Sequence, residues 1–158
     1  PAGEHEPEDD EADGEREALY RKFWEQFLVK ANAQGTLFSR RTTSGNRWIG
    51  TSLGRNGFRL SVAMTRNETR VACQIHHPDG GSALFDVLHA EREAIEKEFR
   101  RVMEWSPLPE QKRSRIRVSV PKGWQLPESE WPDFQMQLVE LAYRLDSVLR
   151  PRILAIVD

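Results

Sequence analysis

Apolar and polar residues alternate along three short segments between residues 46 and 77. The regularly spaced apolar positions are Phe58, Leu60, Val62 and Met64 in one segment and Val71, Cys73 and Ile75 in the next. A period of two residues is typical of β-strands that bury one face and leave the other in water. The glycines Gly54 and Gly57 and the polar residues 66–68 suit tight turns. We therefore predict an antiparallel meander of three strands, the first over residues 47–53.

A period of three to four residues marks three other segments and predicts helices there. The segments are residues 18–33, residues 82–103 and a stretch from about residue 129 to Pro151, which is expected to stop the last helix. The buried stripe expected along the second helix is Phe85, Leu88, Ile95, Phe99 and Val102. The stripe expected along the third helix is Phe134, Leu138, Leu141, Leu145 and Val148.

Residues 113–120 alternate like the meander, and a short strand is expected between residues 105 and 109. The order is therefore helix, three strands, helix, strand, helix. Three amphipathic helices need an apolar surface to pack against. An antiparallel sheet can provide one on one face while its other face stays exposed to solvent. We predict a single two-layer α+β domain over residues 18–158, with an antiparallel sheet of four or five strands packed against three helices.

Charge is divided unevenly along the 158 residues, although the net charge is only −2. Residues 1–17 contain nine acidic residues and one basic residue, which leaves 22 basic and 16 acidic residues for the rest. A leader so acidic and so poor in large apolar residues is expected to be disordered. It is interpreted either as a linker to another domain or as a tail that shields a basic surface. The chain begins without Met, which favours a fragment of a longer protein.

Hydropathy gives no sign of a membrane protein or of an export signal. No apolar run approaches the roughly 20 residues that a membrane-spanning helix needs, and no basic-then-apolar leader is present. A cytoplasmic location is therefore expected.

We find no recognisable metal-binding or phosphate-binding loop in the sequence. No glycine-rich loop ends in Lys-Ser or Lys-Thr, and the strand segments lack the carboxylates that a metal-dependent nuclease needs. His76 and His77 are adjacent at a strand end, where alternation sends them to opposite faces, so one metal ion does not readily bind both. The lone cysteine, Cys73, falls on an apolar strand face. We predict no catalytic residue, no metal and no cofactor in this domain.

Arginines cluster where the meander is predicted. Residues 36–74 hold seven arginines and a single acidic residue, Glu68. Arginine suits phosphate because its planar guanidinium donates two hydrogen bonds at once and keeps its charge. The arginines predicted to contact nucleic acid are Arg47, Arg55, Arg59 and Arg70, with Arg40, Arg41, Arg115 and Arg117 extending the surface, and Trp48 is the candidate for base stacking. The other interpretations are a solvated face, with arginine serving solubility, or a surface that another part of the parent protein covers.

Several motifs resemble those of the prokaryotic family called domain of unknown function 4268. They are Tyr20-x-x-Phe23-Trp24-x-x-Phe27, Trp48-Ile49-Gly50-x-Ser52-x-Gly54-x-x-Gly57-Phe58, Phe85-Asp86-x-Leu88 with Ile95-Glu96, Glu104-Trp105-x-x-Leu108-Pro109 and Arg150-Pro151-Arg152-Ile153. The resemblance covers Leu19 to Ile153. It implies the C-terminal part of a larger protein whose N-terminal part is similar to restriction-endonuclease-like nucleases. That setting implies nucleic-acid processing or phage defence, and no catalytic residues are carried over.

Three hypotheses about function follow. The leading one is a non-catalytic accessory domain of a nuclease-like or phage-defence protein, which contacts DNA or RNA through an arginine-rich sheet face and has the parent's N-terminal nuclease-like domain as a further partner. The alternative is a protein–protein interaction module that docks on an acidic partner or on the parent chain. The third, an enzyme that uses His76 or His77, is disfavoured. Oligomeric state and sequence preference are left open.

Overall fold

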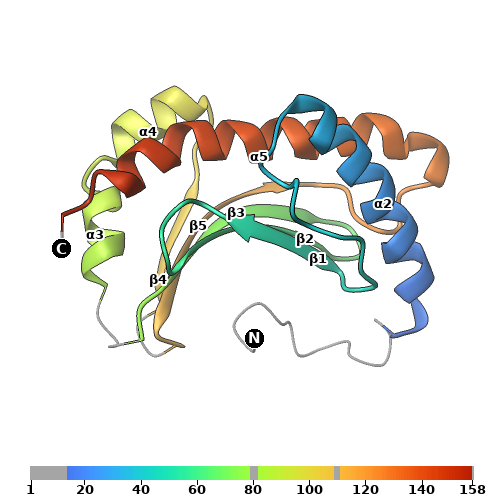
Figure 1. Cartoon of the computed structure of the whole chain (residues 1–158), viewed down its shortest axis with the longest axis horizontal. Coiled ribbons are helices and arrows are strands. Elements are labelled where there is room, and N and C mark those ends of the chain that lie inside the picture. Colours follow the sequence, from blue (N-terminus) through green and yellow to red (C-terminus); the bar gives the residue numbers. More distant parts are fainter. Residues whose placement is uncertain (1–13, 79–81, 109–110, 158) are drawn as a thin grey trace.

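The structure is a computed structural model that describes residues 14–78, 82–108 and 111–157. It consists of one sheet with helices on one side (Figure 1). In chain order the elements are α2 (Glu17–Gln34), β1 (Trp48–Ser52), β2 (Phe58–Met64), β3 (Thr69–His76), α3 (Ala83–His89), α4 (Arg92–Phe99), β4 (Glu104–Leu108), β5 (Arg113–Val120), a 3-10 turn (Glu128–Glu130) and α5 (Trp131–Leu154).

The five strands form one antiparallel sheet in the order β1-β2-β3-β5-β4. The first three strands follow one another as hairpins, and β5 pairs with the other edge of β3. Register sets Leu60 opposite Cys73 and Cys73 opposite Ile116, so the apolar positions of three strands share one face. The α+β class and the antiparallel sheet predicted from the alternation are confirmed.

The apolar face of the sheet packs against the helices (Figure 1). Leu60, Cys73 and Ile116 are fully buried in this layer, and burial raises the pKa of the Cys73 thiol to about 12. Phe23 of α2 meets Trp131 of α5 edge-on, with ring centroids 5.1 Å apart. Burying such apolar area is the main stabilising term in a domain of this size. The other face of the sheet carries no helix of the described chain.

The single helix predicted over residues 82–103 is wrong, because two helices, α3 and α4, occupy this segment and are separated at residues 90–91. Arg100 then ends α4 in the left-handed conformation, with a φ of 68°. Because the chain turns there, Met103 is buried and Val102, which was expected in the core, is 82% exposed. The other four positions of the predicted stripe are buried.

Helix α5 continues past Pro151, where the sequence predicted its end. A proline normally breaks a helix because it lacks an N–H and its ring clashes with the preceding turn. Here the last turn is held from outside the helix. Ile153 is fully buried, and Arg55 donates to the carbonyl oxygens of Ile153 and Ile156 at 3.4 and 2.8 Å. Tertiary contacts therefore outweigh the local helix-breaking preference.

The acidic leader lies outside the described residues as far as residue 13, so its interpretation as a linker or tail stays a prediction. Among the described helices, none has the length and apolar character needed to cross a bilayer.

Candidate nucleic-acid interface

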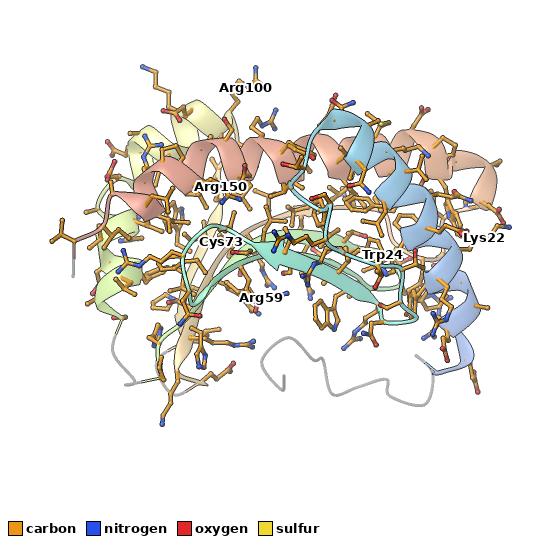
Figure 2. All side chains as sticks on the ribbon, viewed as in Figure 1. Lys22, Trp24, Arg59, Cys73, Arg100 and Arg150 are labelled. Atoms are coloured by element: carbon orange, nitrogen blue, oxygen red, sulfur yellow. The ribbon has the colours of Figure 1, made fainter. Side chains whose placement is uncertain are left out.

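The polar face of the sheet, which we call the arginine face, lies opposite the helices. Its charged residues are Arg59, Arg70, Arg113, Arg115, Arg117 and Glu104. Pairing sets Arg59 opposite Gln74 and Gln74 opposite Arg115, so one row of side chains crosses β2, β3 and β5. Figure 2 shows Arg59 on the side of the sheet away from α5. The period of two therefore brings four of the predicted arginines, those at 59, 70, 115 and 117, onto one face.

Arg113 also belongs to this face, although it was not among the predicted contact residues. It lies two residues before Arg115 on β5 and pairs with His76. The alternation along β5 contains this signal, because positions 113, 115 and 117 all carry arginine. Its guanidinium donates to the side-chain oxygen of Gln111 at 3.1 and 2.9 Å.

Two carboxylates neutralise part of this charge. Glu104 accepts hydrogen bonds from Arg117 at 2.7 and 3.4 Å, and Glu68 forms an ion pair with Arg70 at 2.9 Å. The hydrogen bond from Arg117, together with the charges of Arg117, Arg115 and Arg70, lowers the pKa of Glu104. The arginine face thus favours a bound anionic group, and Arg70 and Arg117 already have a carboxylate partner.

A cleft of about 250 Å³ opens where the arginine face meets the free edge of β1. We call it the Trp48 cleft, and the residues that matter here are Arg40, Arg41, Trp48, Gly50 and Arg59. A Cβ built at Gly50 would lie 3.0 Å from Nη2 of Arg59 and 3.4 Å from Cζ3 of Trp48. The guanidinium and the indole therefore both lie close to a position that carries no side chain.

The three arginines of the Trp48 cleft differ from most others in the protein. Within residues 14–78, 82–108 and 111–157, the side chains of Arg40, Arg41 and Arg59 make no hydrogen bond or ion pair. Arg40 and Arg41 are exposed, and Arg59 is half-buried. A guanidinium with all its donors available can bind an oxyanion without first giving up a protein partner.

Trp48 also differs from other tryptophans of the chain. The indole N–H groups of Trp24, Trp105 and Trp131 donate to Asn46 O, Glu96 Oε2 and Leu126 O. Arg16 covers the Trp124 ring, with its guanidinium carbon 3.8 Å from the ring centroid. Trp48 is half-buried and makes no such contact in the described part of the chain. Its ring is therefore the one best placed to take a flat partner from outside.

The structure places two of the predicted arginines away from the arginine face. Arg47 is buried, with an exposed fraction of 5%, so its expected position on an uncovered surface is wrong. Arg55 turns toward the end of α5, where its guanidinium binds the two backbone carbonyls described above. Both residues sit just outside the strands, where alternation no longer dictates direction.

One motif that the sequence reasoning missed runs from Gly50 to Gly54, with the spacing Gly-x-Ser-x-Gly. A nucleophile elbow of that spacing requires a strand, a sharp turn and then a helix. Here Ser52 ends β1 and the chain enters a hairpin to β2, and the Ser52 Oγ accepts the Gly54 N–H at 2.9 Å. Gly54 has a φ of 93°, which favours glycine. The motif builds a turn in this protein.

The two adjacent histidines separate as the alternation predicts. His76 is exposed, whereas His77 is buried and its Nε2 lies 3.0 Å from the Ser114 hydroxyl. In the part of the chain that the structure describes, no three His, Cys, Asp or Glu side chains are grouped so as to hold a metal ion.

The family model described as a domain of unknown function, DUF4268, matches residues 19–153. The chain belongs to this family. No curated protein and no solved structure matches the chain. The match covers every strand of the sheet and nearly all of the helices, so the arginine face and the Trp48 cleft both lie within the DUF4268 domain.

The residues that carry the resemblance to DUF4268 are mostly used to hold the fold together. Glu96 accepts hydrogen bonds from the Met103 N–H and the Trp105 indole, both at 2.9 Å, and these bonds lower its pKa. Arg152 joins α5 to Glu91 and Glu98 at 3.1 and 3.2 Å. Trp48, Ile49 and Gly50 of the motif also line the Trp48 cleft and therefore connect the family motif to the candidate interface.

Proposed function

We propose that this DUF4268 domain is a non-catalytic accessory domain that binds nucleic acid, within a protein that processes nucleic acid or acts in phage defence. The observation that carries the proposal is the group of Arg40, Arg41 and Arg59 around the ring of Trp48, because these three guanidiniums bind no protein group in the part of the chain that the structure describes. The proposal assigns no bond-making or bond-breaking step to this domain. That work belongs to the N-terminal part of the parent protein.

Phosphate recognition is the role of the arginines. Neighbouring strands lie about 4.8 Å apart, so Arg59 and Arg115, which share a row two strands apart, are separated by about 10 Å at their backbones. With Arg40 and Arg41 at the edge of β1, the positive charges extend from the edge toward the centre of the sheet. Each phosphate that such charges neutralise releases condensed counterions, so binding must weaken as salt rises.

Base recognition is the role of Trp48, and it favours a single strand over a duplex. In a duplex the bases are stacked on each other, whereas those of a single strand are available to aromatic side chains. The Trp48 cleft is about 250 Å³, too small for a helix of nucleic acid but wide enough for a base against the indole. Stacking of this kind tolerates different bases, so we expect little sequence preference.

The test is a titration of labelled single-stranded and duplex DNA at about 50 and about 200 mM salt, the range over which phosphate contacts are lost. The wild-type domain is expected to bind the single strand more tightly. The triple variant Arg40→Ala/Arg41→Ala/Arg59→Ala is expected to lose at least about tenfold in affinity at low salt, because each arginine makes a charge-assisted hydrogen bond. Arg92→Ala, which removes an exposed arginine from α4 on the helix side of the sheet, serves as the matched control.

Two outcomes would count against nucleic-acid binding. One is an isolated domain that binds neither DNA form at low salt. The other is an Arg59→Glu/Arg70→Glu variant that fails to associate with the parent's N-terminal domain while its DNA affinity is unchanged. The second result would favour the protein–protein interaction module instead.

A further inference from the structure

A second and larger cleft, of about 650 Å³, lies on the other side of the free edge of β1. We call it the Tyr143 cleft. Arg40 and Arg41 line both clefts, whereas Tyr143 and Arg150 of α5 and Thr36 and Ser39 of the turn after α2 line only this one. Figure 2 shows Arg150 on the helix side of the sheet, opposite to Arg59. The two clefts therefore open on opposite faces of one edge strand.

The turn that presents Arg40 and Arg41 is held firmly by its neighbours. Phe38, between Ser39 and Leu37, is fully buried and packs edge-on against Phe27 with ring centroids 5.3 Å apart. The Tyr143 hydroxyl accepts the Leu37 N–H at 3.2 Å and donates to the Ala31 carbonyl at 2.9 Å. A turn fixed in this way loses little entropy when its arginines bind an anion.

The lining of the Tyr143 cleft favours an anion with several oxygens. It carries the guanidiniums of Arg40, Arg41 and Arg150 against the single carboxylate of Asp146. Asp146 is already bound to Arg150 at 2.7 Å, and Arg150 also donates to the Ser52 carbonyl at 3.2 Å. Within the described residues no carboxylate forms an ion pair with Arg40 or Arg41, and Thr36 and Ser39 line the same cleft.

From this geometry we propose that the Tyr143 cleft is a binding site for a phosphate monoester, carried by a free nucleotide or by the terminal nucleotide of a strand. Arg40 and Arg41 hold the phosphate, and the hydroxyl groups of the turn donate to its remaining oxygens. A volume of about 650 Å³ lies in the range of pockets that bind small molecules. A diester within a strand offers fewer charged oxygens than a terminal monoester, which is a dianion near pH 7 because its second pKa is about 6. The inference goes beyond the proposed function, because Tyr143, Thr36 and Ser39 line this cleft alone. Arg40 and Arg41 line both clefts, so a nucleotide here and a strand in the Trp48 cleft would use the same two guanidiniums.

The first experiment compares deoxyadenosine monophosphate with deoxyadenosine by nuclear magnetic resonance titration of the full chain. The nucleotide is expected to shift the amides of residues 36–41, and the nucleoside is expected to leave them unchanged. Ser39→Glu adds a carboxylate to the turn and is expected to weaken nucleotide binding by at least about tenfold, since it repels the phosphate. Ser39→Gln matches the glutamate in size without its charge, so a clearly smaller loss with this variant assigns the effect of Ser39→Glu to charge and not to misfolding. Arg59→Ala, in the other cleft, is expected to leave nucleotide affinity within about twofold.

The second experiment identifies the source of the phosphate with 5′-phosphorylated and 5′-hydroxyl single strands. A tighter complex with the phosphorylated strand, abolished by Ser39→Glu, assigns the strand end. Equal affinity for both strands, with nucleotide binding retained, assigns the free nucleotide. Equal response to nucleotide and nucleoside, or nucleotide binding that Ser39→Glu does not change, overturns the proposal. Because Arg59→Ala affects only the Trp48 cleft, failure of this site and failure of the proposed function are distinguishable.

Discussion

Two groups of arginines in this protein have the same chemistry and different uses. Arg55, Arg150 and Arg152 gather at the C-terminal end of α5 and bind backbone carbonyls and carboxylates there. Arg40, Arg41 and Arg59 surround Trp48 at the edge of the sheet, and within the described residues their side chains bind no protein group. The first group holds elements together that are far apart in the sequence, whereas the donors of the second are not used by protein groups among the described residues.

The difference shows that a local excess of arginine says little about binding. In residues 36–74, Arg55 supports the end of a helix, Arg47 is buried and Arg59 lies beside a cleft. These arginines differ in the groups that surround each guanidinium in the folded protein, and the sequence does not specify those groups. Substitutions in the two groups should therefore affect different measurements, stability for the first and binding for the second.

The largest expected effect is on stability, from Arg152→Ala. This change removes ion pairs with Glu91 and Glu98 and a hydrogen bond to the Val148 carbonyl at 2.8 Å. The glutamates are about half exposed, so we expect a loss of about 1–3 kcal/mol in the free energy of unfolding, mostly from the lost backbone bond and packing. Chemical denaturation measures it. Nucleic-acid affinity should stay within about twofold, and a larger loss would mean that the two groups of arginines are not separate.

Trp48→Ala should weaken binding of single-stranded DNA by about 1–2 kcal/mol, the usual effect of losing a base-stacking aromatic. Duplex binding should change less, because its bases are already stacked. Fluorescence anisotropy with both forms of DNA measures the difference. As a control, Trp48→Phe keeps an aromatic ring and should retain most of the affinity. Equal losses for single strand and duplex would contradict a stacking role.

The smallest expected effect is a gain in affinity from Glu104→Gln. Removing this carboxylate releases Arg117 for phosphate and should tighten DNA binding by about two- to threefold, since exposed ion pairs contribute only about 0.2–1 kcal/mol.

The complementary variant, Arg117→Ala, should raise the pKa of Glu104 toward its ordinary value, because Arg117 is the main cause of its low pKa. Nuclear magnetic resonance titration of the Glu104 side chain from about pH 7 to about pH 3 measures this change. An unchanged pKa would mean that the pair does not form in solution.

The sequence predicts the arginine face well, because position on a strand follows a period of two. Once β2, β3 and β5 were recognised, the shared face of Arg59, Arg70, Arg115 and Arg117 followed from alternation and pairing. The helices were predicted less well where a local signal was overridden. The turn at Arg100 needs a left-handed residue that the sequence does not mark with glycine, and α5 passes Pro151 because distant residues hold its last turn.

The clefts could not be predicted, because they depend on contacts between segments far apart in the chain. Arg40 and Arg41 are placed by the anchoring of Phe38 and by the bond from the Leu37 N–H to Tyr143, which is 106 residues away. The position of the Arg55 side chain follows from its hydrogen bond to the Ile156 carbonyl, which is 101 residues away. No spacing in the sequence reports such partners. Trp48 could be singled out from its position beside Arg47. Only the structure shows that its indole is half-buried and, among the described residues, makes no hydrogen bond or ring contact of the kind seen at the other tryptophans.

The most direct test of nucleic-acid binding by the Trp48 cleft is the slope of log affinity against log salt for a single strand, measured for the wild type and for Arg40→Ala/Arg41→Ala/Arg59→Ala. Each phosphate contact contributes about 0.7 to the slope for single strands, so the triple variant should lose about 2 from its magnitude. Its stability should match that of the wild type. A triple variant with the wild-type slope and affinity would contradict the claim that these three guanidiniums bind phosphate.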